Sequence, residues 1–251
     1  MRNMKVRPYF DRCLVALAAL LLFSFSCYAE TPGEFEEKYD PNGLVEVHVK
    51  ADPNAPYNSR KTDWSWRFVA DYEAFYPNQY VSLVDGAGYA TIFGSNQGAL
   101  ISGGLGVQYN TKIGALFVDG IYGTGGIKGV TTGVMQVSKY GLGFGYMLDT
   151  LSAHPWVSPF VAGQAIYFGY NETDTNISSA GTTQITTGVM AGLSIHLDKI
   201  DPDAARNAYM DYGIRNTFLD IYAVQYNTSN SKTDPNLQTT ANIGAGLHVE
   251  F

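Results

Sequence analysis

The stretch from residue 139 to residue 148 reads KYGLGFGYML, and it alternates strictly between two kinds of side chain. Large apolar residues occupy one parity: Tyr140, Leu142, Phe144, Tyr146 and Leu148. The other parity holds three glycines with Lys139 and Met147. Successive side chains of a β-strand point to opposite faces of the sheet, so this stretch predicts a strand with one apolar face and one face of small residues.

The same alternation recurs along the chain on both sides of this stretch. Eight strands are predicted, at residues 64–76, 97–109, 112–123, 133–147, 156–169, 184–197, 215–227 and 238–251. Segment 156–169 is apolar on both parities, so its faces stay unassigned. Only residues 201–212 suggest a helix between strands, and antiparallel hairpins are therefore the expected connections.

The parity opposite the apolar one decides the fold class. A soluble β-sandwich turns its polar parity to water, and this parity should be rich in Lys, Glu and Thr. Here it consists largely of Gly, Ser and Gln, and charged residues make up only 16% of the chain. A transmembrane barrel turns apolar side chains to lipid and small or polar ones to its lumen. We therefore predict an all-β, eight-stranded antiparallel up-and-down transmembrane β-barrel, with a soluble sandwich or an exported lectin-like domain as the alternative.

The connections between the predicted strands alternate in length. If the first strand starts in the periplasm, the outer connections are residues 77–96, 124–132, 170–183 and 228–236, which are rich in Gly, Asn, Ser and Thr. Two inner connections are short, at residues 110–111 and 149–155. The third, residues 198–213, departs from the rule that periplasmic turns are short, and it has room for one or two helical turns.

The first 29 residues have the three parts of a secretory signal peptide. Four basic residues precede the apolar run CLVALAALLLFSFSC, and Ala29 provides a small residue at a cleavage site. A membrane anchor is the alternative, but the run is shorter than the ~20 residues that span a bilayer. A lipoprotein signal at Cys27 lacks the usual Leu three residues earlier. The predicted domains are a signal peptide (1–29), a periplasmic N-terminal extension (30–62) and an outer-membrane barrel (63–251).

Removal of that signal changes the charge and the cysteine count. The chain of 251 residues has a formal net charge of −7, and without residues 1–29 it keeps 12 basic and 22 acidic residues, hence −10. Both cysteines, Cys13 and Cys27, leave with the signal. An acidic chain does not suit a nucleic-acid partner, and a chain without thiols has no disulfide framework and no cysteine ligand for a metal.

The chain ends on Phe251, which closes the alternating segment NIGAGLHVEF. This segment resembles the carboxy-terminal signature of Gram-negative outer-membrane barrels, in which a terminal aromatic residue is the insertion signal. With the strand count and the export signal, residues 64–251 resemble the small eight-stranded OmpA/OmpX/OmpW-like superfamily. The resemblance implies localisation in the bacterial outer membrane, with membrane lipid and the barrel-insertion machinery as partners. It also implies, through OmpW-like members, the alternative of a narrow channel for small or apolar solutes.

Several charged residues fall on the parity expected to face the lumen. They form a predicted lumen charge network: Arg67, Asp71, Glu73, Asp119, Lys139, His196, Asp220, His248 and Glu250. Asp119 and Lys139 are expected to pair across their hairpin, with Asp71 at a similar height. Arg67 is expected near the seam between first and last strands, close to His248 and Glu250. Unpaired charges would be costly there, so the network is interpreted as a polar plug, with a gate as the alternative.

Catalytic and metal sites find little support. Ser194 and His196 share a lumen face, but a Ser-x-His pair alone is a weak signal for a nucleophile and its base. Asp201 and Asp203 lack the spacing of a calcium loop. We therefore expect no enzyme, cofactor or metal, with a lipid-modifying enzyme as the less favoured alternative. The predicted role is structural, or the binding of an extracellular ligand through the outer loops.

Overall fold

A computed structural model of the chain describes residues 36–39, 45–48, 61–130, 132–152, 154–174 and 177–251. Strands β1 (Glu36–Tyr39) and β2 (Val45–His48) pair antiparallel in a two-stranded sheet of their own. The predicted signal peptide at 1–29 lies outside the described residues, as does most of the predicted extension at 30–62. The remaining described residues, between 61 and 251, contain the larger sheet and its connections.

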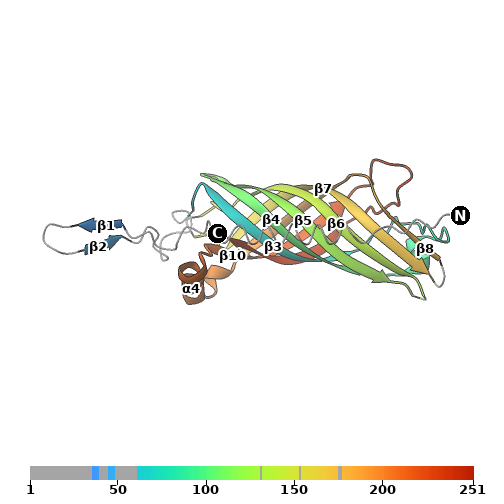
Figure 1. The fold of residues 1–251 in the computed structure, drawn as a ribbon, viewed down its shortest axis with the longest axis horizontal. Helices are drawn as coiled ribbons and strands as arrows, with labels where there is room; N and C mark the ends of the chain where they lie inside the picture. The colour runs from blue at the N-terminus through green and yellow to red at the C-terminus, as the bar shows by residue number, and fades with distance from the viewer. Residues whose placement is uncertain (1–35, 40–44, 49–60, 131, 153, 175–176) are drawn as a thin grey trace.

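From residue 64 onward the chain forms a closed antiparallel barrel of eight strands (Figure 1). They are β3 (Trp64–Phe75), β4 (Gly98–Thr111), β5 (Gly114–Lys128), β6 (Val134–Met147), β7 (Val157–Asp174), β9 (Thr186–His196), β10 (Asn216–Tyr226) and β11 (Asn242–Glu250). Consecutive barrel strands pair with each other, and β11 pairs with β3 to close the sheet. The structure confirms the predicted fold class.

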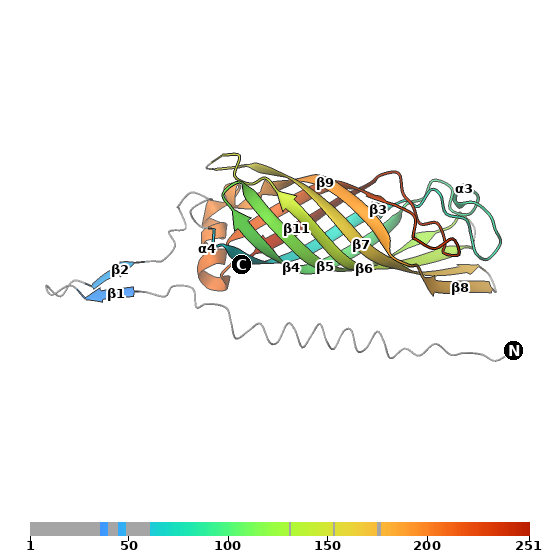
Figure 2. The same cartoon turned by 90° about the horizontal axis from the view of Figure 1, so that it is seen from above.

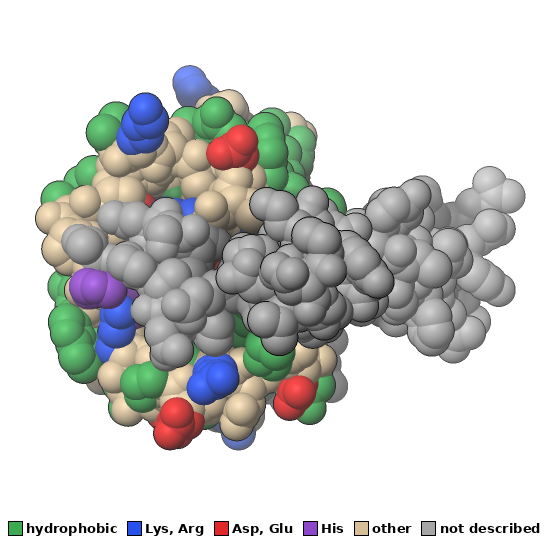
Figure 3. All heavy atoms as spheres, turned by 90° about the vertical axis from the view of Figure 1, so that its left-hand side faces the viewer, with side chains coloured by type: hydrophobic (Ala, Val, Ile, Leu, Met, Phe, Trp, Pro, Cys, Tyr) green, Lys and Arg blue, Asp and Glu red, His purple; other side chains and the backbone are tan. Residues whose placement is uncertain are grey.

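The two parities of each strand lie on the two faces of the barrel wall. Outward side chains such as Leu142 and Phe144 are 59% and 62% exposed, whereas inward ones such as Glu73 and Lys139 are 0% and 3% exposed. The inward parity of β7, which the sequence left unassigned, is the one with Ser158 and Gln164. Hydrophobic side chains gather around the circumference of the barrel, while charged ones stand on its end face (Figure 3). The wall is therefore apolar outside and polar inside.

The strands extend further at one end than the sequence predicted. This end, opposite to Phe251, is called the outer end below. β5 continues to Lys128 and β7 to Asp174, and β8 (Ile177–Thr182) pairs only with β7. Two segments that were predicted as loops, residues 124–132 and 170–183, therefore contain strand. The last strand differs in the other direction, because it begins at Asn242 and not at residue 238. Gly, Ser and Thr in these segments look like loop residues, but antiparallel partners satisfy their backbone groups.

The connection between β3 and β4 folds over the outer end and carries the short helix α3 (Tyr89–Ile92) (Figure 2). Its large side chains Tyr80, Tyr89 and Phe93 are buried. The Tyr80 hydroxyl donates a hydrogen bond of 2.7 Å to Glu172 Oε2, and the Leu83 amide donates to the same oxygen at 3.1 Å. Burial raises the pKa of Tyr80, with a further increase from Glu172. This outer loop is thus clamped onto the end of β7.

At the inner end, where Phe251 lies, the connection between β9 and β10 forms η2 (Leu197–Lys199) and the helix α4 (Pro202–Tyr212). Asp201 caps α4 by accepting a bond of 3.0 Å from the Ala204 amide, and Gly213 ends it in the left-handed conformation with φ of 71°. The helix runs across the barrel axis (Figures 1 and 2). Among the described helices, none is long and apolar enough to cross a membrane.

Candidate functional site: the lumen charge network

All nine residues of the predicted lumen charge network lie on the inward parity of their strands. Eight of them are buried and Asp71 is half-buried. They come from β3 (Arg67, Asp71, Glu73), β5 (Asp119), β6 (Lys139), β9 (His196), β10 (Asp220) and β11 (His248, Glu250). Seven of them form three clusters at successive heights, held by hydrogen bonds and ion pairs. His196 lies beside the middle cluster, and Asp71 borders a small gap next to Arg67, Asp119 and Asp220.

The outer cluster is centred on Glu73 of β3. Lys139 Nζ donates to Glu73 Oε2 at 2.9 Å, and the Tyr226 hydroxyl donates to the same oxygen at 2.8 Å. The other oxygen, Oε1, accepts from Asn242 Nδ2 at 2.7 Å. All four residues are buried. The carboxylate thus has a cation and two neutral donors, which is the arrangement that a buried charge requires.

An aromatic layer covers the outer cluster on the side of the outer end. Phe75, Phe168 and Tyr226 pack against one another with ring centroids 5.2 to 6.2 Å apart. None of the three is more than 1% exposed. The large rings and the ion pair therefore lie next to one another inside the barrel.

The central cluster joins β3, β5, β10 and β11. Arg67 Nε lies 3.4 Å from Asp119 Oδ2, and Arg67 Nη2 lies 3.7 Å from Asp220 Oδ2. That Asp220 oxygen also contacts His248 Nδ1 at 2.6 Å. The guanidinium stacks 4.2 Å from the Phe117 ring centroid. Arg67 therefore lies between two carboxylates whose strands, β5 and β10, are each two strands away from β3 in opposite directions around the sheet.

The inner cluster surrounds Glu250, which lies opposite Arg67 in the β3–β11 register. Gln108 Nε2 donates to Glu250 Oε1 at 2.6 Å, and Asn216 Nδ2 donates to Oε2 at 2.7 Å. The predicted seam between the first and last strands, with Arg67 near His248 and Glu250, agrees with this register. Phe251 continues it, because its amide donates to the Trp66 carbonyl at 3.0 Å.

The predicted pairing of Asp119 with Lys139 is wrong. In the β5–β6 register Asp119 lies opposite Gly143, and Lys139 lies opposite Gly123, so the two side chains differ by four residues in height. The prediction counted β5 from residue 112, but residues 112–113 belong to the turn and Ala115 is the partner of Met147. Each charge instead finds its partner on β3: Lys139 binds Glu73, and Asp119 binds Arg67.

His196 has a different serine partner from the one that the sequence suggested. Its Nε2 lies 2.7 Å from Ser158 Oγ, and its ring packs edge-on against Phe218 at 4.5 Å. The Phe218 ring also stacks on the ring of His248, with the two ring centroids 4.1 Å apart. Ser158 and His196 are at most 2% exposed inside the barrel. A nucleophile and base must meet a substrate, so this buried pair has the character of a packing contact.

Some residues of the network were missed in the sequence. Tyr226, at the outer end of β10, is fully buried in the lumen and was not among the predicted network residues. The sequence did contain a signal for the inward position of this side chain. Residue 226 has the same parity along β10 as Asp220 and Tyr222, whose side chains also point inward. Phe117 and Asn242 give no such signal, because their roles depend on neighbours across the lumen.

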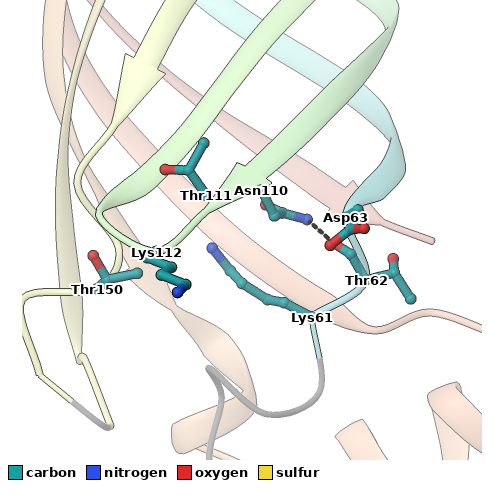
Figure 4. Close-up of a pocket in the computed structure, with 7 residues that line it drawn as sticks. All are labelled: Lys61, Thr62, Asp63, Asn110, Thr111, Lys112 and Thr150. Atoms are coloured by element: carbon teal, nitrogen blue, oxygen red, sulfur yellow. Dashed lines mark hydrogen bonds between the residues drawn. The ribbon is translucent and has the colours of Figure 1, made fainter.

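Among the described residues, a small gap lies inside the barrel and a larger cavity lies at one of its ends. A gap of about 30 Å³, enough for a single water molecule, lies among Arg67, Asp71, Asp119, Gln164 and Asp220. A cavity of about 340 Å³ lies at the inner end, lined by Lys61, Thr62, Asp63, Asn110, Thr111, Lys112 and Thr150 (Figure 4). There Asn110 donates to the Thr62 carbonyl at 2.8 Å, and Lys61 pairs with the buried Asp149. Within residues 61–251 as described, no cluster of three or more His, Asp or Glu has the arrangement of a metal site.

Comparison with known proteins bears on the fold. No family model and no curated protein matches the sequence. Among solved structures, the chain is similar to Neisserial surface protein A, with 16% identity, a TM-score of 0.44, and 76% of this chain and 98% of that one covered. The N-terminal β-barrel domain of OprF from Pseudomonas aeruginosa gives 13% identity, a TM-score of 0.42, and coverage of 74% and 97%. Ail, the attachment invasion locus protein of Yersinia pestis, gives 11% identity and a TM-score of 0.40, with 75% of this chain and 97% of that one covered.

Proposed function

We propose that this protein is an integral barrel of the bacterial outer membrane whose lumen is closed by its own side chains. The observation that carries the proposal is the contrast between the two faces of the wall. Exposed Leu142, Phe144 and Val161 face outward while the charge network is buried inside. A soluble protein would bury such an apolar face, and lipid is the solvent that suits it.

The closed lumen is supported by the three clusters and the aromatic layer. Eight strands leave an interior just wide enough for side chains. In the outer cluster, Glu73, Lys139 and Tyr226 meet within hydrogen-bond distance, although they come from three different strands. The gate or narrow-channel alternative requires these bonds to break, and the buried charges would then lose their partners.

The function itself is then exerted at the outer end, as a structural or surface-binding role. The clamp between Tyr80 and Glu172 holds the outer loop in place, and exposed apolar side chains stand on this end: Val81, Leu83, Val130 and Ile177. Export through the signal at residues 1–29 and recognition of Phe251 by the insertion machinery complete the proposal.

The membrane assignment is tested by gel mobility and by partitioning. A closed barrel in detergent resists SDS until it is heated, so the unboiled protein should migrate at a different position from the boiled one. The same protein should fractionate with phospholipid vesicles after refolding. A chain starting at residue 30 that is monomeric in buffer without detergent would reject the proposal.

A further inference from the structure

The helix α4 poses a problem of stability. It has 11 residues, and none of them is buried. Isolated helices shorter than about 12–15 residues are marginal in water, and most helices in proteins gain their stability from an apolar face packed on something else. The cap at Asp201 and the Gly213 terminus contribute, and Ala205, Ala208 and Tyr209 are half-buried, but Ala204, Met210 and Tyr212 stay exposed.

The sequence of α4 has an apolar side. Ala204, Ala208 and Tyr212 follow at intervals of four, so they lie in one row along the helix. The adjacent row at the same interval holds Asp203 and Asn207, followed by Asp211. Tyr212 is 72% exposed, and Ile200, just before the helix, is 67% exposed. Single exposed apolar residues are common on protein surfaces, so it is the place of these two beside the rim of the barrel that bears on their role.

The position of α4 supplies the covering surface. The helix lies at the inner end, transverse to the barrel axis in both ribbon views, and therefore parallel to the plane of a surrounding bilayer (Figures 1 and 2). The wall ends at this inner end in exposed aromatics: Trp156, just before β7, is 59% exposed and Trp64, at the start of β3, is 63% exposed. The His196 amide, just before η2, donates to the Trp156 carbonyl, so the chain enters the α4 connection from this aromatic rim. Tryptophan and tyrosine are the residues enriched where hydrocarbon meets headgroups.

We propose that α4 is an interfacial lipid-binding helix: its Ala204–Ala208–Tyr212 row, continued by Ile200, lies in the headgroup region of the inner leaflet, and its Asp203–Asn207–Asp211 row faces the periplasm. The proposal rests on the membrane assignment above. It explains why the third inner connection is long, since a short turn would leave no helix to lie on the bilayer. An amphipathic helix in this plane fixes the depth and tilt of the barrel.

Nitroxide labels on single cysteines test this orientation in the full chain. Cys13 and Cys27 are replaced by serine, and the protein is refolded into vesicles of phosphatidylethanolamine and phosphatidylglycerol. Labels are then placed at Ala204→Cys and Tyr212→Cys, with Asp203→Cys and Asn207→Cys as matched controls. Leu142→Cys reports the barrel wall and Lys232→Cys reports water. Collision with oxygen, which concentrates in lipid, is compared with collision with a water-soluble nickel chelate.

The proposal expects labels at 204 and 212 to favour oxygen, and labels at 203 and 207 to favour the nickel chelate. If all four favour nickel while the Leu142 label favours oxygen, α4 stands in water and the inference is overturned, although the membrane assignment survives. If all four resist both reagents, a protein surface covers α4, which also overturns it. If the Leu142 label itself favours nickel, the membrane assignment fails.

Discussion

Lys139 on β6 and Glu73 on β3 are three strands apart around the barrel wall, and yet their charged atoms lie 2.9 Å apart in the lumen. Both side chains are almost completely buried. The pair ties two distant parts of the wall together. The Tyr226 hydroxyl donates to the same Glu73 oxygen, and Phe75 of the aromatic layer packs against the Tyr226 ring.

Removal of Lys139 should therefore be costly. In Lys139→Met the Glu73 carboxylate keeps Tyr226 and Asn242 but loses its cation, and removing one partner of a buried pair destabilises a protein by about 3–5 kcal/mol. Urea unfolding in vesicles should show this loss. The double variant Lys139→Met/Glu73→Gln should recover most of it, and Lys128→Met at the exposed outer end should change little. A single variant as stable as the wild type would contradict the role of the pair.

Gly106 provides the space for the Asp119 carboxylate. A Cβ atom at residue 106 would clash with Asp119 Oδ1 and with the Val118 carbonyl on the neighbouring strand. Gly106→Ala should lower the free energy of unfolding by about 1–3 kcal/mol, as overpacking usually does. Gly103→Ala is the matched control on the lipid-facing side, where the nearest atom would be 3.8 Å away. Equal unfolding midpoints for the two variants would show that the Asp119 contact with β4 is unimportant.

A charge on the outer wall should be as unfavourable as a missing charge in the lumen. Leu142 faces outward near the middle of β6, and Arg at the bilayer midplane costs about 2–4 kcal/mol in such barrels. Leu142→Arg should therefore fold less stably in vesicles, whereas Ile177→Arg on β8, beyond the barrel, should fold as the wild type does. Loss of stability in both variants, or in neither, would argue against lipid around β6.

The outer loop should open at high pH. Burial raises the pKa of the Tyr80 hydroxyl, and so its neutral form is bound more favourably in the folded loop than in the open one. The stabilisation is complete below the ordinary tyrosine pKa of about 10, and it is lost as the pH rises from there toward the raised value. Cleavage of the loop by proteinase K should accelerate above about pH 10.

The matched variant for the loop is Tyr80→Phe. It loses the hydrogen bond to Glu172, worth about 0.5–1.5 kcal/mol, and so it should be cleaved faster at neutral pH. Its cleavage should depend less steeply on pH; some dependence remains because burial also raises the pKa of Tyr89. A wild-type loop that is cleaved at the same rate from pH 8 to 12 would refute the clamp.

The faces of the wall could be predicted from sequence, but the partners inside the lumen could not. A period of two assigns Arg67 or Asp220 to a face without any knowledge of the neighbours, because a strand has only two faces. A pair such as Lys139 and Glu73 depends on the stagger of four strands, and an error of three residues at the start of β5 moved Asp119 to the wrong height. Tyr226 gives an ambiguous signal for a different reason, since a tyrosine suits both a lipid interface and a lumen.

The extra strand length at the outer end could not be predicted from the sequence either. β8 contains Ser178, Ser179 and Gly181, which are typical of loops, and it is a strand only because β7 offers an unpaired edge beyond the barrel. Nothing in residues 170–183 alone shows that edge. Segments that depend on the shape of their neighbours are the ones that a single sequence leaves undetermined.

Conductance across a planar lipid bilayer tests the central claim, that the lumen is closed by the Glu73–Lys139–Tyr226 cluster. The account predicts no discrete current steps for the wild-type barrel. It predicts steps for the triple variant Glu73→Ala/Lys139→Ala/Tyr226→Ala, provided that this variant still shows the heat-dependent gel shift. Reproducible steps from the wild type, unchanged in the triple variant, would contradict the closed lumen.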